Sequence, residues 1–417
     1  MGEPPARSAR ADSAASARRA ELCGEDEDPS MTERLYYTDA YLRDFDAAVV
    51  GRADGGLRVY LDRTAFYPTS GGQPFDLGVL GDSPVVDVVD EGDRIAHVLS
   101  MPLAAARVTG RLDWTRRFDH MQQHTGQHIL SAVIADLFGH STVSVHFGAE
   151  SSTLDLDTGA LSADRIVEAE RWANAVVTEN RQVRVSFEDA ATAAGLRKAP
   201  DRLGRLRIVT IDELDRSACG GTHVHATGEI GTILIGRVER VKQLARLEFL
   251  CGGRAIRRAR EGHDLLVRLA TLFSATPVEL PALVESQRGE LKKAIAEAKE
   301  LGDRLAGYRA AELYAGAVPD AAGRRIVVAR EEGGAVDRLR ALGHAVARMP
   351  RAVLIGATST PPTVLLATAD DSGVDAGRML KAALEKEGGR GGGNPRMAQG
   401  TVADQPAVEA VIRAVSG

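Results

Sequence analysis

The chain has few cysteines and no long apolar run, and both shortages exclude classes of protein. Its 417 residues include three cysteines, Cys23, Cys219 and Cys251, an odd number that argues against a disulfide framework and favours a reducing, cytoplasmic location. No stretch of about 18 uninterrupted apolar residues occurs, so no membrane span is expected. The G-x-S-x-G elbow of α/β-hydrolases and the Walker A loop are also absent, which disfavours those two enzyme classes.

The chain also lacks a positive net charge. Its formal charge of -6 excludes a uniformly basic nucleic-acid binder, although such a sum can hide local patches. Residues 1–30 are rich in acidic and small residues and nearly free of large apolar ones, which predicts a disordered tail. In "RAIRRAR", four arginines fall within two helical turns at positions 254, 257, 258 and 260. This run is either a solvated helix face or a contact for RNA phosphates.

What is present is enough chain for several domains, on the rough scale of 100 to 200 residues each. Short β-like runs in residues 31–111 predict a small β-rich domain. Residues 112–254 predict an α+β domain, with helices over 118–138 and 163–180 followed by strands. Residues 255–317 read as a helical hairpin or a short coiled-coil spacer. Residues 318–417 alternate apolar runs with helix-like segments, which is typical of an α/β domain. The predicted fold class is therefore α+β and multidomain.

Two donor pairs with the same spacing point to a metal site. In "HTGQH", His124 and His128 stand four residues apart, so a helix would place both imidazoles on one face, within reach of one ion. Farther along the chain, Cys219 and His223 repeat this spacing across two glycines that allow a sharp turn. Either pair alone is typical of ordinary surface or core residues. Together they supply the nitrogen and sulfur donors that Zn²⁺ takes tetrahedrally.

Three segments in a fixed order carry a family resemblance. With "TAFYPTSGGQPFDLG" at 64–78, "HTGQH" at 124–128 and "DRSACGGTHVHATGEIG" at 215–231, the chain resembles the editing part of alanyl-tRNA synthetases and the free-standing AlaX editing proteins. The segment "GGRGGGNPRMAQGT" at 388–401 resembles the glycine-rich signature of the DHH-associated domain that ends those synthetases. No counterpart of the aminoacylation domain is seen, so the pattern resembles a long-type AlaX protein acting in trans.

The resemblance implies a fold and a site. It implies a small N-terminal β-barrel, an editing domain shared with threonyl-tRNA synthetases, a helical spacer and a tRNA-binding C-terminal domain. It places four residues on the zinc motif, namely His124, His128, Cys219 and His223. It places Gly71, Gly72 and Gln73 on a loop that faces the reaction centre, and Thr64 on the position that recognises a serine hydroxyl. Backbone N–H groups of the two glycines are expected to stabilise an oxyanion.

The implied function is zinc-assisted hydrolysis of the aminoacyl ester of tRNA(Ala) mischarged with serine, with glycine left open as a second substrate. Contacts with tRNA are expected from five arginines, Arg254, Arg257, Arg258, Arg390 and Arg396. The helical spacer either sets the distance between two RNA contacts or forms a homodimer with the C-terminal half. Whether zinc is catalytic, orients the substrate or is structural stays open at this point.

Two alternatives compete with this function. The first is a non-catalytic tRNA- or RNA-binding protein in which zinc is only structural. The second is a phosphodiesterase of the DHH group, which is disfavoured because "FDHMQQH" has Met121 where an Asp-His-His motif needs its second histidine.

Overall fold

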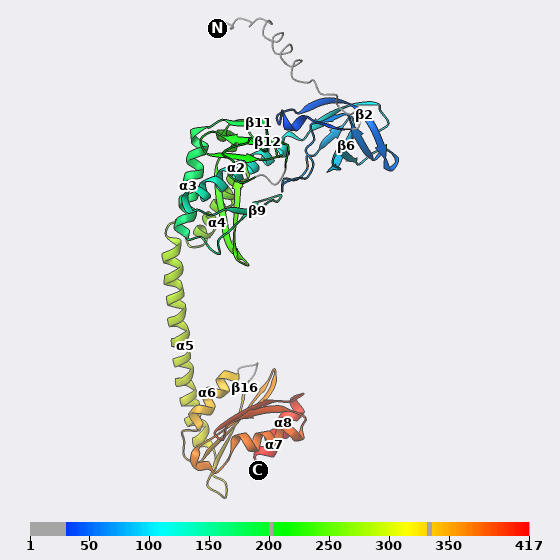
Figure 1. The fold of residues 1–417 in the computed structure, drawn as a ribbon. Helices are drawn as coiled ribbons and strands as arrows, with labels where there is room; N and C mark the ends of the chain where they lie inside the picture. Colours follow the sequence, from blue (N-terminus) through cyan, green and yellow to red (C-terminus); the bar gives the residue numbers. More distant parts are fainter. Residues whose placement is uncertain (1–30, 200–202, 332–335, 417) are drawn as a thin grey trace, which may run out of the picture. The chain divides into compact units, whose positions relative to one another are not determined.

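The computed structural model describes residues 31–199, 203–331 and 336–416, so the predicted tail at 1–30 lies outside the described residues (Figure 1). The chain forms two compact units that divide between Leu266 and Val267. This division falls within helix α4 (Gly253–Leu272), whereas the sequence placed a domain boundary at 254/255. Each unit is described below by itself.

The first unit begins with a closed β-barrel, which confirms the expected N-terminal barrel. Its strands follow the order β2-β3-β7-β6-β5-β8 around the barrel. Their bounds are β2 Asp44–Ala53, β3 Arg58–Leu61, β5 Gly78–Leu80, β6 Ser83–Asp90, β7 Ile95–Leu99 and β8 Arg107–Leu112. Alternate residues of β8 point inward, and Gly110 is one of them. A larger residue does not fit there, because a Cβ at this position would come within 2.4 Å of the Phe45 ring. The short strands β1 (Glu33–Arg34) and β4 (Arg63–Thr64) pair in parallel.

An α+β domain follows the barrel in the same unit. Helix α2 (Trp114–Phe138) begins at the Asp113 cap, whose side chain accepts a hydrogen bond from the Arg116 N–H, and ends at Gly139 in the left-handed region. Helix α3 (Ala163–Glu179) begins after Ser162 and ends at Asn180. Two antiparallel sheets accompany these helices. One has the order β14-β15-β10-β9 and the other β11-β12-β13.

These two sheets are built from strands both near to and far from α2 in sequence. The bounds of the first are β9 Thr142–Phe147, β10 Ser152–Leu156, β14 Ile233–Val241 and β15 Leu244–Cys251. Those of the second are β11 Val183–Asp189, β12 Arg205–Ile211 and β13 Asp215–Ala218. Most of α2 is buried, from Arg117 to Ile134, so even its polar side chains lie in the interior of the domain. Buried polar groups of this kind need partners within the protein.

The second unit contains helix α5 and a C-terminal domain. Helix α5 (Leu280–Gly316) has Pro281 in its first turn, where the missing N–H has no cost. The sheet has the order β16-β17-β18-β20-β19, and only the β16–β17 pair is parallel. The bounds are β16 Arg325–Glu331, β17 Ala352–Ser359, β18 Pro362–Thr368, β19 Arg390–Gly393 and β20 Met397–Thr401, with helices α6 Val336–Val346, α7 Ala376–Lys386 and α8 Gln405–Ser416.

The apolar runs in this sheet are explained by two cores. Helices α7 and α8 pack with one set of sheet side chains, including Ile355 and Leu366, while α6 and the end of α5 pack with another, including Leu354 and Leu365. Strands buried on both faces are expected to be apolar at consecutive positions. Among the described residues, no helix is both long and apolar enough to cross a membrane.

Candidate metal centre

The structure brings the four predicted metal ligands together. His124 and His128 lie one turn apart on α2, and Cys219 and His223 lie on the loop that follows β13. Their four donor atoms all lie within 4.8 Å of one another and could hold a metal ion. The Cys219 Sγ atom is 3.4 Å from the Nε2 atoms of both His124 and His223.

Glycine at position 221 allows the loop to pass directly over one of these histidines. A Cβ at Gly221 would lie 2.1 Å from the His124 ring. No rotation of a buried imidazole on a packed helix could relieve such a clash without moving the donor atom. The two glycines between Cys219 and His223, read from the sequence as a sharp turn, therefore also allow this close approach.

Each imidazole in the cluster has a partner on its Nδ1 atom. The three contacts are His124 Nδ1 with Gln73 Oε1 at 2.8 Å, His128 Nδ1 with Asp215 Oδ2 at 2.7 Å, and His223 Nδ1 with Thr125 Oγ1 at 3.1 Å. A hydrogen bond at one ring nitrogen fixes the tautomer and the orientation of the ring, and so presents the other nitrogen to a metal. Sequence reasoning missed the roles of Asp215 and Thr125, although both lie within the motifs that it used.

The charges around the centre favour a thiolate at Cys219. Burial alone would raise the pKa of this thiol, but the charges of His124 and His223 and hydrogen bonds from histidines bring it well below its ordinary value. Cys251, by contrast, is buried without such partners, so burial raises its pKa and keeps the thiol protonated. Only one of these two cysteines is therefore suited to bind a metal ion.

Asp215 is the fixed negative charge beside the cluster. It is buried, and its Oδ1 atom accepts a hydrogen bond of 2.6 Å from Arg197. Burial would raise its pKa, but the hydrogen bond to His128 and the charges of His128 and Arg197 lower it to about 2. In the protein without metal, burial opposes the charged form of His128, but the bond to Asp215 outweighs this effect and raises the pKa of His128 to about 9.

The glycine-rich loop forms a tight turn that directs Gln73 toward the metal centre. Ser70 and Gln73 exchange two backbone hydrogen bonds of 3.1 and 2.9 Å, and Gly71 and Gly72 between them have φ angles of 55° and 84°. The Gln73 side chain is buried, with its Nε2 atom donating to Thr222 Oγ1 at 2.9 Å. Within the described chain, the N–H groups of the two glycines have no partner. Their predicted oxyanion role is not tested by this geometry.

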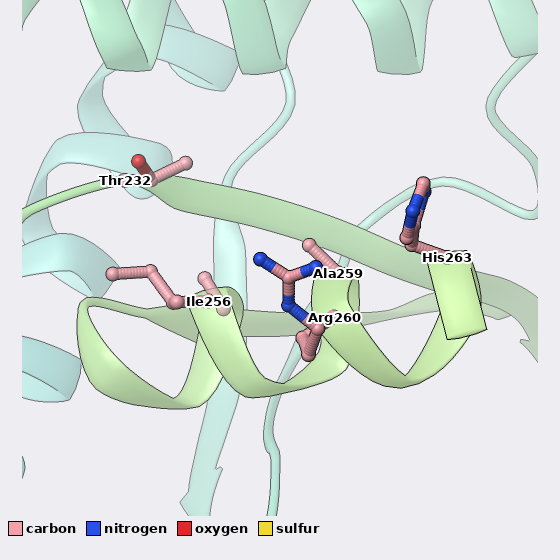
Figure 2. A pocket seen from close by; sticks show the side chains of 6 residues that line it. Thr232, Ile256, Ala259, Arg260 and His263 are labelled. Carbon is pink, nitrogen blue, oxygen red and sulfur yellow. The ribbon is translucent and has the colours of Figure 1, made fainter.

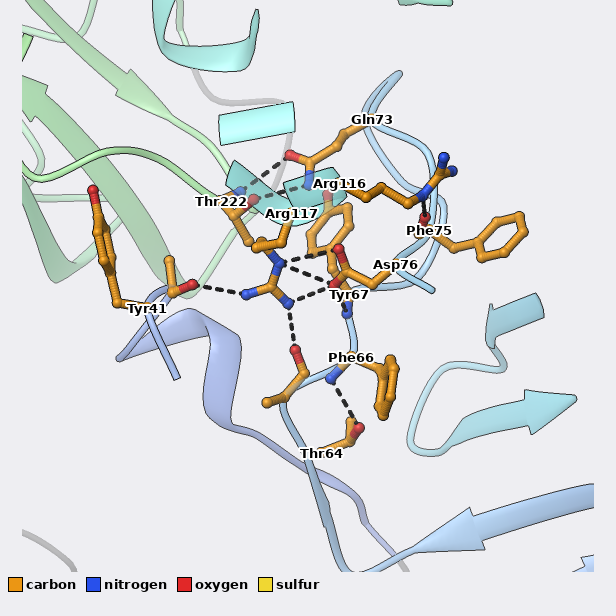
Figure 3. Close-up of polar contacts among 12 residues, drawn as sticks. Tyr41, Thr64, Phe66, Tyr67, Gln73, Phe75, Asp76, Arg116, Arg117 and Thr222 are labelled. Carbon is orange, nitrogen blue, oxygen red and sulfur yellow. Dashed lines mark hydrogen bonds and ion pairs between the residues drawn. The ribbon is translucent and has the colours of Figure 1, made fainter. Parts of the chain in front are cut away.

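A buried ion pair joins the barrel to α2 beside this turn (Figure 3). The side chains of Arg117 and Asp76 are both fully buried and make several contacts with each other. Arg117 also donates to the carbonyl groups of Ala40 and Ala65, and Asp76 accepts from the Tyr67 N–H at 2.7 Å. The sequence analysis did not identify this pair, which holds the loop carrying Gln73 against the helix carrying His124.

Thr64 lies inside the barrel. Its hydroxyl is fully buried, 2.8 Å from His97 Nε2, and accepts a hydrogen bond from the Phe66 N–H at 3.1 Å. In Figure 3, Thr64 lies on the other side of the Arg117–Asp76 pair from Gln73. A hydroxyl has two acceptor positions, so one remains after these contacts. Recognition of a serine hydroxyl by Thr64 stays a prediction, and it requires the substrate to reach a buried side chain.

The prediction that Arg254 contacts tRNA is corrected by the structure. Arg254 is only 4% exposed, and its guanidinium bonds to the Asp119 carboxylate and, at 2.7 Å, to the Gly148 carbonyl. These contacts leave it no surface for RNA. Arg257 and Arg258 are exposed on the same helix, and Arg390 and Arg396 are exposed in the C-terminal domain, where Arg396 pairs with Asp370.

The larger of two described pockets does not include the metal centre. It has a volume of about 440 Å³ and lies along α4, and its lining includes Thr232 and, from that helix, Ile256, Arg260 and His263 (Figure 2). None of the four donor residues lines it. A second pocket of about 170 Å³ lies next to His223.

Comparisons with known proteins identify relatives of this chain. Residues 206–248, which include the Cys219–His223 loop, match the family described as the threonyl and alanyl tRNA synthetase second additional domain. The chain is 32% identical to an alanine–tRNA ligase of Pyrococcus furiosus over 410 residues, covering 93% of this chain and 43% of that relative. It thus spans less than half the length of the ligases that it matches.

One relative is matched along nearly its whole length. The alanyl-tRNA editing protein AlaX-L of Pyrococcus horikoshii is 31% identical over 395 residues, which cover 90% of this chain and 96% of the relative. The chain belongs to the AlaX-L family. A solved C-Ala domain from the Aquifex aeolicus alanyl-tRNA synthetase also matches 24% of the chain at 20% identity, with a TM-score of 0.21 that is too low to support an argument.

Proposed function

We propose that this AlaX-L family member is a zinc-dependent deacylase that hydrolyses the aminoacyl ester of Ser-tRNA(Ala), with Gly-tRNA(Ala) as a second candidate substrate. The observation that carries the proposal is the cluster of His124, His128, Cys219 and His223, in which every imidazole is oriented through its Nδ1 atom. The names of the relatives support alanyl-tRNA as the substrate class. A cytoplasmic location stays a prediction that accompanies a tRNA substrate.

The donor set fits Zn²⁺, since three imidazoles and one thiolate are ligands that this ion accepts in a tetrahedral site. When bound, the ion would supply a Lewis acid that polarises or orients groups of the substrate. The chain's own residues orient the ligands and offer hydrogen-bond donors. Gln73, Thr125 and Asp215 hold the rings in place, and the free N–H groups of Gly71 and Gly72 offer donors for a developing oxyanion.

One feature of the cluster favours the alternative of a non-catalytic, tRNA-binding protein with a structural zinc ion. Structural zinc sites have four protein ligands, whereas catalytic sites usually have three and keep one position open. Here four donors lie close enough to bind at once. The two functions therefore differ in whether one of the four ligands leaves the ion when substrate binds.

Contacts with tRNA away from the metal centre are also part of the proposal. Arg257 and Arg258 on α4, and Arg390 on the edge strand β19, are exposed and positively charged. Exposed apolar side chains along α5 support the further prediction of a homodimer through the C-terminal half, namely Leu291, Ile295, Leu301 and Leu305.

The test is hydrolysis of tRNA(Ala) charged with serine, glycine or alanine by the purified protein, with and without a chelator. We expect release of serine but little release of alanine, and loss of activity with the chelator. The result with glycine decides whether Gly-tRNA(Ala) is a second substrate. Cys219→Ala should abolish both zinc binding and hydrolysis, whereas Cys251→Ala, a matched control at a buried thiol outside the cluster, should keep both. A protein that retains its zinc but leaves Ser-tRNA(Ala) intact would establish the non-catalytic alternative.

A further inference from the structure

The smaller pocket adjoins the metal centre without containing it. It is lined by Tyr37 from the segment before the barrel strands, by Val185 of β11, by Arg207 of β12, and by His223 and His225. Its volume of about 170 Å³ is below the range of roughly 300 to 1,000 Å³ that is typical of pockets for drug-sized ligands. A pocket of this size suits a small ion or a single chemical group.

Arg207 is a buried cation that bonds to no carboxylate among the described residues, and the negative charge that most raises its pKa is that of Cys219. It is 9% exposed, and its Nε atom donates to the Tyr37 carbonyl at 3.0 Å. Its Nη1 atom donates to the carbonyl groups of Cys219 and Gly221 at 2.7 and 2.9 Å. These acceptors are neutral, and burial lowers the pKa of Arg207. A buried charged group needs hydrogen-bond partners for its polar atoms, because the loss of hydration is costly.

The remaining nitrogen of this guanidinium points to a ligand. Nη2 has no hydrogen-bond partner in the described parts of the chain. It is not sealed from solvent, since it is absent from the buried side-chain atoms that lack a partner. Arg207 lines the pocket, so its guanidinium is within reach of a group bound there. A guanidinium with a free donor at the wall of a small pocket is well suited to bind an oxyanion such as a phosphate group.

An aromatic pair lies at the same pocket. The rings of His225 and Tyr41 are stacked, with centroids 3.8 Å apart and planes 16° from parallel. The Tyr41 hydroxyl accepts from the His225 N–H at 3.1 Å and also contacts Glu229, which fixes the pair in place. His225 is exposed, so its ring is accessible to a further group. Single-stranded RNA is commonly bound by base stacking on such rings together with cationic contacts to its backbone.

We propose that the Arg207 pocket binds a phosphate group in the single-stranded 3′ end of tRNA, with a neighbouring base stacked on His225. This inference rests on the proposed function and adds a place where the acceptor end is held beside His223. Free inorganic phosphate has the same chemistry, so the experiment must separate the two sources.

Val185 offers a test that leaves the bonds of Arg207 intact. Val185 is 40% exposed and lines the pocket. On the neighbouring strand it pairs with Val209, two residues from Arg207, so Val185 and Arg207 lie diagonally across the β11–β12 pair. Side chains so related on one face of a sheet are within reach of each other. Val185→Glu should place a carboxylate next to Nη2 and compete with a phosphate, and Val185→Gln is the matched neutral control.

The readouts are the KM for Ser-tRNA(Ala), the rate with 3′-seryl-adenosine, which has no phosphate, and inhibition by inorganic phosphate. We expect Val185→Glu to raise the KM for Ser-tRNA(Ala) roughly tenfold relative to Val185→Gln, which corresponds to about 1.4 kcal/mol. Hydrolysis of 3′-seryl-adenosine and the zinc content should be the same in both variants. Inhibition by inorganic phosphate should be weaker in Val185→Glu.

The inference is overturned if the two variants have the same KM and the same sensitivity to phosphate. It is also overturned if only the sensitivity to phosphate differs, because the pocket then binds free phosphate rather than RNA. If the wild-type protein hydrolyses neither substrate, the proposed function fails. Binding of uncharged tRNA(Ala) then tests the proposed phosphate site in the Arg207 pocket. Weaker binding by Val185→Glu than by Val185→Gln supports this site, and equal binding by the two variants overturns it.

Discussion

Gln73 Oε1 lies 2.8 Å from the Nδ1 atom of His124, and this contact joins the barrel to the metal centre. The same oxygen accepts a hydrogen bond from the Thr222 N–H at 3.2 Å, so one amide group orients a ligand and also fixes the loop that carries two others. The acceptor end of a tRNA would then meet a site assembled from both parts of the first unit. Neither the barrel nor the α+β domain alone supplies this arrangement.

Replacing Gln73 tests the importance of this contact. Gln73→Leu keeps a side chain of similar size but removes both hydrogen-bonding groups, and loss of such a partner typically weakens metal binding roughly 10- to 100-fold. Zinc affinity can be measured by competition with a chromogenic chelator. Ser70→Ala, in the same turn but without a side-chain contact to His124, should bind zinc like the wild type. Equal affinities for Gln73→Leu and Ser70→Ala would show that the ring of His124 is held by packing alone.

The buried pair of Arg117 and Asp76 should be essential for the stability of the first unit. Arg117→Met leaves a buried carboxylate without its counter-charge, which typically costs about 3 to 5 kcal/mol. The exposed pair of Arg111 and Asp44, with side chains 70% and 58% exposed, is the control, and Arg111→Ala should cost about 1 kcal/mol or less. Both tryptophans, Trp114 and Trp172, lie in the first unit, so their fluorescence during urea unfolding reports on it. Similar losses in both variants would contradict this account.

Local sequence signals were sufficient for the elements that carry the site. Helix α3 was expected over 163–180 and spans Ala163–Glu179, because Ser162 and Asn180 cap its two ends. The four candidate metal ligands, which the structure brings together, could be picked out because helical spacing and a glycine turn are local features. Helix α2 begins at Trp114, after the Asp113 cap. The sequence analysis placed its beginning at residue 118 because it did not recognise this cap.

Contacts between distant segments could not be found in the same way. The burial of Arg254 depends on Asp119, which is far from it in sequence. An arginine-rich helix has the same local sequence pattern whether one of its arginines faces solvent or pairs with an acidic residue. The short strands β9, β10 and β13 were not predicted either. Of these, β10 pairs with β15, so that Ser152 faces Phe249 from a distant part of the chain. Likewise, nothing in "SGGQ" alone shows that Gln73 reaches a histidine on another element.

Thr64→Val separates two roles for this residue. Valine keeps the shape of threonine but loses the hydrogen bonds to His97 and the Phe66 N–H, so we expect a loss of roughly 1 to 2 kcal/mol in stability. If Thr64 also recognises the substrate hydroxyl, the ratio of Ser-tRNA(Ala) to Ala-tRNA(Ala) hydrolysis rates falls as well, which is the result we expect. An unchanged ratio in a folded variant would confine Thr64 to the barrel interior.

His97 should make the barrel sensitive to acid. Burial lowers its pKa to about 4, and its Nδ1 atom bonds to the Val59 carbonyl at 3.2 Å, so the folded protein holds it neutral and its Nε2 atom accepts from Thr64. An unfolded histidine takes up its proton near pH 6.5, so between about pH 6.5 and 4 the unfolded state binds more protons and stability falls as the pH decreases. The full loss of stability between these pH values is about 3 kcal/mol, at 1.36 kcal/mol for each unit of pKa.

His97→Gln should lose correspondingly less stability between pH 7 and 4.5 in urea unfolding, whereas His263→Gln, at an exposed histidine, should follow the wild type. Parallel pH profiles for His97→Gln and the wild type would mean that the barrel accommodates a charged His97.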